Sequence, residues 1–480
     1  MVFSSIQFLF LFLPCVIGIY ALLPGSKLRN LFLLVCSLIF YAWGERLFTT
    51  VMIATIVMTW ACGILIDSQH NPKVRSWMLG VGISINLLLL AYFKYAGFIA
   101  ENWVNTLNFL GVSIQVHPLF TNVHLPIGIS FFIFQAISYL IDLYRKEIGC
   151  QKNVLRLALY KSFFPQLIAG PIVRYSDIEN EIEKRPLKWS LFSEGTYRFC
   201  IGLAQKVLIA NPMGQLADEI FNAPLHELTP LTCWIGAIAY SLQIFFDFAG
   251  YSNMAIGLGR IFGFTFPENF NLPYTARSVT DFWRRWHMSL STWFRDYLYI
   301  PLGGNRCSKL RNYMNLFVVF LLCGFWHGAS WTFIIWGGFH GLFLCIEKAG
   351  LLKTLERSPA FLARTYTLLA VLIGWVFFRS ETLTHAFQFL SKMFLGVGEP
   401  LSPDYLTLYD LLSYERMLVL VVGIALALDL LPRFSRTPGV LLQYKPYLEF
   451  SKGLGFSCIF LVCLIYLAGG TFNPFIYFRF

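Results

Sequence analysis

Residues 2–23 read VFSSIQFLFLFLPCVIGIYALL and contain no charged side chain. A helix needs roughly 20 apolar residues of this kind to cross the hydrocarbon core of a bilayer. A cleaved signal peptide would begin with basic residues and end at a small-residue cleavage site. This stretch has no basic residue before it and ends at Leu23-Pro24. It is therefore predicted to be a retained membrane-spanning helix.

Similar apolar stretches recur along the whole chain. Of its 480 residues, 57% are hydrophobic and 13% are charged, and the mean hydropathy is +0.61. Soluble domains carry about 25% charged residues. We therefore expect an all-α, polytopic membrane protein with about twelve spans, forming one domain over residues 1–480. The expected spans cover residues 5–23, 29–43, 48–66, 77–98, 125–143, 192–212, 230–258, 313–328, 331–347, 361–378, 416–432 and 453–470.

One further apolar segment, residues 157–173, is interrupted by Lys161, Pro165 and Gly170-Pro171. Broken backbone at membrane depth is tolerated only where protein surrounds it or where it lines a cavity. We expect this segment to be re-entrant.

Charge in the loops orients the expected spans. Loops 99–124 and 213–229 contain no Lys or Arg, whereas loops 144–156 and 259–312 are rich in both. The positive-inside rule places the basic loops in the cytoplasm, and alternation then places both termini outside. The net charge of +11 thus reflects orientation and contact with membrane lipid, and nucleic acid is not an expected partner. Multi-pass insertion in a bacterial inner membrane is the expected localisation.

The eleven cysteines are scattered singly, mostly inside apolar runs, and no CxxC pair occurs. Cysteine in such a setting behaves as a small hydrophobic residue. Neither a disulfide framework nor a metal site is predicted.

Residues 278–299, SVTDFWRRWHMSLSTWFRDYLY, differ from their surroundings. Their aromatic residues recur at spacings of three and four, which predicts one face of a helix. Basic and polar residues fill the rest, so this helix is expected to lie at the membrane interface or to wedge into the protein. His287 stands beside the aromatic stripe. It is either a functional residue or an incidental histidine on an anchor helix.

A second polar position is His327, in the sequence GFWHG at residues 324–328 at the end of an expected span. An ionisable side chain at membrane depth is costly and points to function. The flanking glycines allow close approach of a substrate, and histidine exchanges protons near neutral pH. The alternative is a histidine hydrogen-bonded between packed helices. His340, within GGFHG, is a weaker instance, and Asp247 either pairs with a nearby Arg, which we favour, or lines a cavity.

Four long stretches follow one another along the chain: FFPQLIAGPIVRY (163–175), FFDFAGYSNMAIGLGRIFGF (245–264), NFNLPYTARSVTDFWRRWHMSLSTWFRDYLYIPLGG (269–304) and GFWHGASWTFIIWGGFHG (324–341). They resemble the membrane-bound O-acyltransferase family, in its bacterial branch that modifies alginate and teichoic acid. The length is similar to that of the alginate-type O-acetyltransferase subgroup. Residues 269–341 would form the central region that carries the active site.

The resemblance implies that His327 is the catalytic histidine and that His287 is the second characteristic polar position. It also implies a ring of helices around a thin centre, with a cytoplasmic opening for a thioester donor and an outer funnel. A partner of the SGNH-hydrolase type on the outer side would complete transfer to a polymer. No bound cofactor is expected, because acetyl-coenzyme A or an acyl-carrier thioester would be a substrate.

The required chemistry suits these residues. Acyl transfer from a thioester needs a base for the incoming hydroxyl, a group that polarises the carbonyl, and a dry, aligned channel. We assign His327 as the base and His287 as the orienting or polarising group. Candidate substrate-binding residues are Arg284, Arg285, Arg295, Trp326 and Asp247. The three arginines could bind donor phosphates, or could simply be positive-inside charge.

The chain ends in an aromatic segment, residues 471–480, that includes Tyr477. Such a segment is typical of an interfacial belt. Similar tails in the family suggest a second hypothesis, that Tyr477 accepts the acyl group as an activated aryl ester and passes it outward.

Two other functions remain open from the sequence. In a transporter or flippase, His327 and Asp247 would relay protons. No internal repeat is visible, which counts against many transporters. A lipid or protein O-acyltransferase of the same family would need no outer partner. The polymer itself is not identified by any motif.

Overall fold

The structure is a computed structural model and describes residues 2–121, 123–185, 187–397, 405–430, 445–470 and 472–474. Every regular element in these ranges is a helix, which confirms the all-α class. The chain divides into two compact units, each assembled from segments that are separated in the sequence. Unit 1 comprises Met1–Gly195, Leu258–Pro267 and Trp326–Ser330; unit 2 comprises Thr196–Gly257, Glu268–Phe325 and Trp331–Phe480.

Six helical stretches of the described chain are long and apolar enough to cross a membrane. They are Gly25–Gly44, Phe48–Ser68, Pro72–Phe109, Pro230–Ile261, Trp331–Arg357 and Ala360–Arg379, with shorter apolar stretches at Phe8–Leu22 and Gly453–Gly469. Each of the six overlaps one expected span. The expected total of about twelve stays a prediction.

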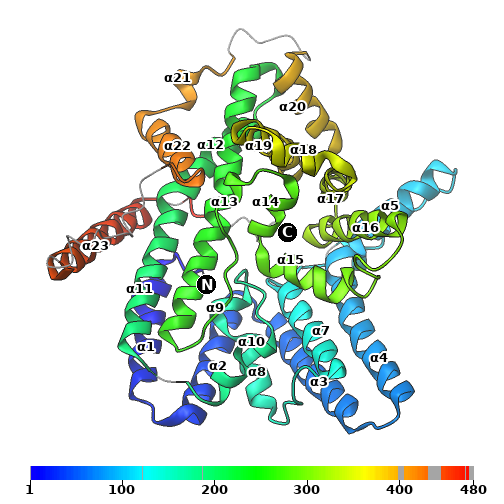
Figure 1. Cartoon of the computed structure of the whole chain (residues 1–480), viewed down its shortest axis with the longest axis vertical. Coiled ribbons are helices and arrows are strands. Elements are labelled where there is room, and N and C mark those ends of the chain that lie inside the picture. The colour runs from blue at the N-terminus through cyan, green and yellow to red at the C-terminus, as the bar shows by residue number, and fades with distance from the viewer. Residues whose placement is uncertain are drawn as a thin grey trace. The chain divides into compact units, whose positions relative to one another are not determined.

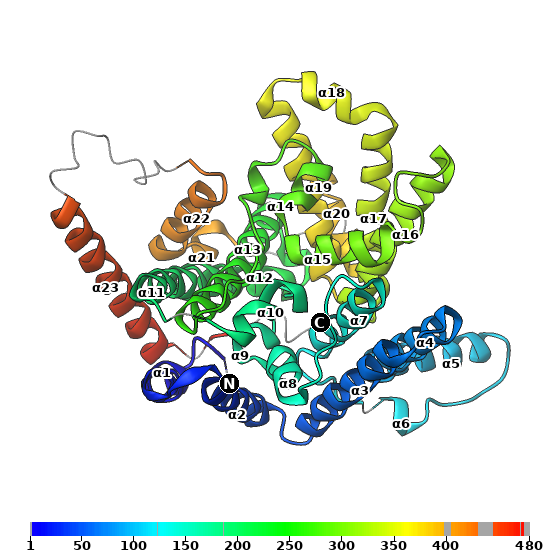
Figure 2. The same ribbon diagram turned by 60° about the horizontal axis from the view of Figure 1, so that its bottom comes forward.

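Unit 1 is built on α7, a helix whose residues are nearly all buried. Small residues let its neighbours approach, as is common between membrane helices: Gly63 of α3 faces Tyr139, and Gly82 of α4 faces Leu140. Figures 1 and 2 show α3 and α4 side by side, and both pack against α7. The helices of this unit are η1 (Phe8–Phe12), α1 (Leu13–Leu22), α2 (Gly25–Gly44), α3 (Phe48–Ser68), α4 (Pro72–Leu90), η2 (Ala91–Tyr95), α5 (Ala96–Phe109), α6 (Pro118–Thr121), α7 (Ile129–Arg145), α8 (Val154–Ser162), α9 (Phe164–Leu167) and α10 (Tyr175–Glu183).

The interrupted segment 157–173 lies in unit 1 and is buried along its whole length. α8 ends at Ser162, α9 occupies a single turn, and the chain then continues without regular structure. The Lys161 ammonium donates to the Thr55 carbonyl and the Thr59 hydroxyl, each at 3.0 Å. The structure thus confirms that this backbone is broken and enclosed by protein.

In unit 2, α11 and α13 cross at two glycines. A Cβ on Gly202 would stand 2.4 Å from the Gly250 carbonyl oxygen, so only glycine permits the contact. α12 packs on α22, α17 on α19, and α19 on α20 (Figure 2). The helices that run in or into this unit are α11 (Trp189–Ala204), η3 (Gln205–Ala210), α12 (Asn211–Asn222), η4 (Leu225–Glu227), α13 (Pro230–Ile261), η5 (Pro273–Thr275), α14 (Val279–Arg285), α15 (Met288–Phe294), η6 (Arg295–Tyr299), α16 (Lys309–His327), α17 (Trp331–Ile346), η7 (Glu347–Leu351), α18 (Leu352–Arg357), α19 (Ala360–Arg379), α20 (Leu383–Leu395), α21 (Leu408–Leu411), α22 (Tyr414–Ala427) and α23 (Lys445–Gly469).

Three local expectations are corrected. The helix that begins at Pro72 continues to Phe109, so the first ten or so residues of expected loop 99–124 are helical. Expected loop 213–229 contains most of α12. Residues 278–299 do not form one helix, because α14 ends at Arg285 and α15 begins at Met288.

Candidate functional site

The residues singled out from the sequence divide between the two units. His327 and Trp326 belong to unit 1, whereas His287, Asp247 and the three arginines belong to unit 2. Tyr477 lies outside the described residues.

His327 is the last residue of α16 and is 4% exposed. The ring of Trp326 lies beside it, with the two ring centres 4.9 Å apart. Trp326 in turn packs against Phe131 and Phe134 of α7, at 5.7 and 5.3 Å between ring centres. The histidine therefore lies beside a tryptophan that packs against α7, a helix whose residues are nearly all buried. This packing gives Trp326 a supporting role for His327.

Lys94, which the sequence reasoning did not single out, contacts the same tryptophan. Its ammonium donates to the Trp326 carbonyl at 2.5 Å and lies 5.6 Å from the centre of the indole ring. The sequence does contain a signal for Lys94, because it is an isolated charged residue inside the apolar run LLLLAYFKYAGF.

His287 occupies the break between α14 and α15. Its backbone is left-handed, with φ 44° and ψ 53°, which is strained for a residue with a Cβ. The side chain is fully buried and meets the ring of Phe248 edge-on, with ring centres 4.6 Å apart. A segment that precedes α14 in the sequence holds this turn, because the amide of Met288 donates to the Asn269 carbonyl at 2.9 Å.

Asn269 secures this turn a second time through its side chain. Its Oδ1 accepts from the Ser289 hydroxyl at 2.9 Å, and its Nδ2 donates to the Ser252 hydroxyl on α13 at 3.0 Å. Burial lowers the pKa of His287 to about 3. At neutral pH the ring is therefore uncharged and can donate through one nitrogen. Both features suit a residue that orients or polarises a carbonyl.

A buried carboxylate holds the start of α14. Glu347 is completely enclosed and accepts from the amides of Val279 and Thr280 at 2.6 and 2.8 Å. The hydroxyls of Thr280 and Tyr366 also donate to it, at 2.6 and 3.2 Å. An anion at a helix N-terminus satisfies free amides and complements the helix dipole. Glu347 thereby fixes the helix that carries Trp283 and Arg284.

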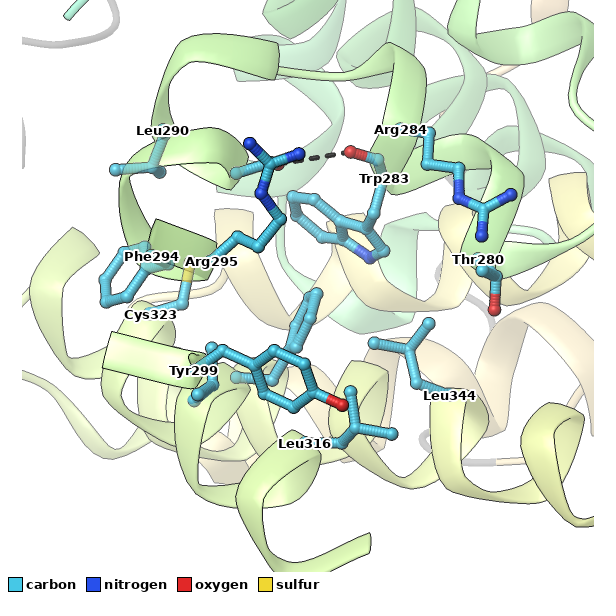
Figure 3. A pocket seen from close by; sticks show the side chains of 13 residues that line it. Thr280, Trp283, Arg284, Leu290, Phe294, Arg295, Tyr299, Leu316, Cys323 and Leu344 are labelled. Carbon is cyan, nitrogen blue, oxygen red and sulfur yellow. Dashed lines mark hydrogen bonds between the residues drawn. The ribbon is translucent and has the colours of Figure 1, made fainter. Parts of the chain in front are cut away.

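A pocket of about 210 Å³ opens beside this helix, within unit 2 (Figure 3). Its walls come from α14, α15, η6, α16 and α17, and they are largely apolar. Trp283 and Cys323 contribute to the lining, with Arg284, Arg295 and the Tyr299 ring among the polar residues. An apolar cavity with few polar groups is the usual form of a small-molecule site.

The three candidate arginines have different surroundings. Arg285 pairs with Asp281 one turn earlier, at 2.9 Å, and is not among the pocket residues. Arg295 lines the pocket but pairs with Asp296, at 2.6 Å. Arg284 also lines it, is exposed, and has no ion-pair partner within the described part of the chain. Arg284 is thus the guanidinium best placed to meet an anionic ligand there.

Asp247 is paired, with a lysine rather than an arginine. Its carboxylate lies 2.7 Å from the Lys206 ammonium, and both side chains are at least 95% buried. Lys206 also donates to the carbonyl of Pro474, near the end of the chain. This arrangement favours a structural role for Asp247 over substrate binding.

His340 lies on α17 against the rings of Trp283 and Trp336, at 5.1 and 5.2 Å between centres. It is 1% exposed, and neither ring nitrogen has a hydrogen-bond partner among the described residues. Gly374 leaves room for it, since a Cβ there would stand 2.7 Å from Nε2. This environment is that of a packed histidine. No cluster of potential metal ligands occurs in the described ranges.

Comparison with known proteins gives the chemistry. The sequence profile of the membrane-bound O-acyltransferase family matches residues 117–379. A probable alginate O-acetylase of Azotobacter vinelandii is 39% identical over an alignment that covers 100% of both chains. A peptidoglycan O-acetyltransferase of Helicobacter pylori is 37% identical over 82% of this chain and 80% of its own. A teichoic acid D-alanyltransferase of Bacillus subtilis is 33% identical over 45% of this chain and 58% of its own.

The match spans more than half of the chain and includes both histidines. It also favours an acyltransferase over the transporter that the sequence left open. This chain is a membrane acyltransferase and belongs to the membrane-bound O-acyltransferase family.

Proposed function

We propose that this protein transfers an acetyl group from a cytoplasmic thioester donor to a polysaccharide outside the cell membrane. Similarity over the full length to an alginate O-acetylase, and over most of it to a peptidoglycan O-acetyltransferase, supports an acetyl group and a glycan acceptor. A bacterial inner membrane is the corresponding location.

The pocket of unit 2 is the observation that carries the donor half of this proposal. A pantetheine-like thioester arm is long, thin and weakly polar, and it ends at phosphate groups in coenzyme A and in carrier proteins. The apolar pocket offers the arm a dry environment, and the free guanidinium of Arg284 offers a partner for phosphate. Arg295, which is paired with Asp296, lies on the same wall.

His327 acts as the general base in the proposed reaction. It takes the proton of the incoming hydroxyl while the hydroxyl oxygen bonds to the thioester carbonyl carbon. His287, uncharged because it is buried, is our candidate for the group that orients or polarises the acyl carbonyl. The carbon–sulfur bond then breaks, and the thiolate leaves and recovers the proton from His327.

The tail hypothesis adds a relay. Tyr477 would be the first hydroxyl acceptor, and its aryl ester would pass the acetyl group to an SGNH-hydrolase-like partner on the outer side. Direct transfer to another hydroxyl would leave Tyr477 unmodified.

Label transfer from radiolabelled acetyl-coenzyme A to the purified full chain tests these steps. His327→Ala is compared with His70→Ala, which alters an exposed histidine after α3. Tyr477→Phe is compared with Tyr409→Phe, because Tyr409 is 93% exposed. We expect label in the unaltered chain and in both controls.

Label that requires both His327 and Tyr477, and that maps to the C-terminal peptide, would support the relay. Label that requires His327 but not Tyr477 would support His327 as the base and would mean that another group accepts the acetyl group. If the unaltered chain shows no label and cleaves no thioester, that result would contradict acetyl-coenzyme A as the direct donor. A carrier-protein thioester would then be the next probe.

A further inference from the structure

Lys94 lies within a candidate membrane span. Residues Ala91–Tyr95 form a π-helical turn, η2, between α4 and α5. A charged side chain within a span is costly, so it is expected to face protein and to have a specific partner.

That partner is the residue before His327. The Lys94 ammonium donates to the Trp326 carbonyl at 2.5 Å and lies over the Trp326 ring. The Ser130 hydroxyl of α7 is a weaker contact, at 3.5 Å. All of these residues belong to unit 1. Lys94 is therefore directed at the backbone that carries the candidate base.

The contact has a clear physical effect. The last carbonyls of a helix have no partner inside the helix, and they form the negative end of its dipole. A lysine ammonium there satisfies one carbonyl and complements the dipole. α16 ends at His327, and the Trp326 carbonyl belongs to the peptide group that joins the two residues. The bond from Lys94 to this carbonyl therefore holds the end of the helix and the backbone from which the His327 side chain projects.

We propose that Lys94 is the positioning residue for His327 and sets the place from which its imidazole takes a proton. The inference rests on the proposed role of His327 as the base. Loss of the ammonium would free the last turn of α16 while leaving the donor pocket of unit 2 intact. Proton transfer is sensitive to misplacement, and about 1 Å can cost on the order of 100-fold in rate.

Steady-state cleavage of acetyl-coenzyme A by the full chain in detergent tests this role. Lys94→Met keeps the length of the side chain and removes its charge. We expect kcat to fall by at least about tenfold, with KM for the donor within about twofold. Lys94→Arg, which retains a cationic donor, should recover part of kcat. Lys73→Met is the matched control, because Lys73 is exposed near the start of the same continuous helix.

A thermal midpoint measured for each variant separates positioning from folding. If Lys94→Met does not accumulate, Lys94→Gln supplies a neutral donor that is one heavy atom shorter, and a smaller fall in kcat in the same direction is expected. A normal kcat in Lys94→Met, or in Lys94→Gln where Lys94→Met does not accumulate, beside an inactive His327→Ala, would overturn the role of Lys94 and leave the proposed function standing. If the neutral variant loses kcat, thermal midpoint and donor binding together, and Lys94→Arg recovers none of them, Lys94 has a general structural role and does not position His327. Full turnover in His327→Ala would remove the proposed function itself.

Discussion

His287 combines a left-handed backbone with a side chain that is fully enclosed. Each feature costs free energy, and each is held by neighbours: the backbone by Asn269, and the ring by Phe248. Residues kept in sparsely populated conformations cluster at functional sites. The strained backbone and the burial of His287 therefore support the orienting role proposed for it.

Burial of the His287 ring predicts that the protein loses stability in acid. The pKa of His287 is lowered to about 3 in the folded chain, whereas an unfolded histidine titrates near pH 6.5. The unfolded state therefore binds a proton first, so this residue's contribution is complete above about pH 6.5 and is lost as the pH falls toward 3. Between pH 7 and pH 5 the loss is up to about 2 kcal/mol.

The variant His287→Asn isolates this effect, since asparagine tolerates a left-handed backbone and does not titrate. We expect its thermal midpoint in detergent to fall less between pH 7 and pH 5 than that of the unaltered chain. His70→Asn, at an exposed position, should fall as the unaltered chain does. Equal acid sensitivity in all three proteins would show that His287 is not the responsible group.

Sequence reasoning identified some of these residues and missed others for physical reasons. His287 and His327 stood out because they are polar residues inside distinctive motifs. Lys94 and Lys206 are equally isolated inside expected spans, and Glu347 ends one. Each makes contacts to residues far along the chain. Such partners are set by tertiary packing, which a local pattern does not contain.

At the scale of elements, the spacing of aromatic residues predicted one helix over residues 278–299, where the structure has two. Trp283, Trp286 and Trp293 are all buried, so the apolar stripe was read correctly. The break carries no Gly or Pro, the residues that usually mark one. Hydrogen bonds from Met288 and Ser289 to Asn269, which lies outside the stripe, hold the break.

The crossing of α16 and α17 is set by a pair of glycines. A Cβ on Gly324 would stand 2.2 Å from the Phe333 carbonyl oxygen, and one on Gly337 would stand 2.4 Å from the Phe320 carbonyl oxygen. Neither backbone can yield without moving a helix. Gly338, next along α17, has only side-chain atoms nearby, the closest at 3.6 Å.

Alanine substitutions should therefore give opposite results at adjacent positions. We expect Gly324→Ala and Gly337→Ala to reduce the folded yield and to lower the thermal midpoint. Gly338→Ala should be neutral or slightly stabilising, by up to about 1 kcal/mol, because alanine favours a helix over glycine. Size-exclusion profiles and melting curves in detergent measure both effects. Indistinguishable Gly337→Ala and Gly338→Ala proteins would contradict the close crossing.

At the scale of the whole chain, residues 473–474 are tied back to the interior of unit 2. Lys206 donates to the Pro474 carbonyl across 268 positions of sequence, and Asn211 donates to the Asn473 side chain at 3.3 Å. Lys206 is delivered by η3, a π-helical turn that follows the glycine crossing of α11 and α13. The buried ion pair with Asp247 holds the Lys206 ammonium in the position from which it donates to Pro474.

Releasing this tether should expose the chain end to trimming. Lys206→Met alone would leave the Asp247 carboxylate buried without its cation, which is strongly destabilising. The double variant Lys206→Met, Asp247→Leu replaces the pair with apolar side chains of similar size and still removes the donor to Pro474. A charge-assisted hydrogen bond contributes about 1.5–3 kcal/mol, so carboxypeptidase should remove the residues after Pro474 at least about tenfold faster.

Mass spectrometry of the digested protein follows that trimming, and Lys188→Met, an exposed lysine before α11, is the control. Asn211→Leu should accelerate trimming less, because its bond to Asn473 is longer and uncharged. An unchanged rate in the double variant would mean that the terminus is held elsewhere. A faster rate with a normal thermal midpoint would establish that the buried pair serves the tail rather than the fold. Pro474 would then be placed by a charge pair formed between η3 and α13.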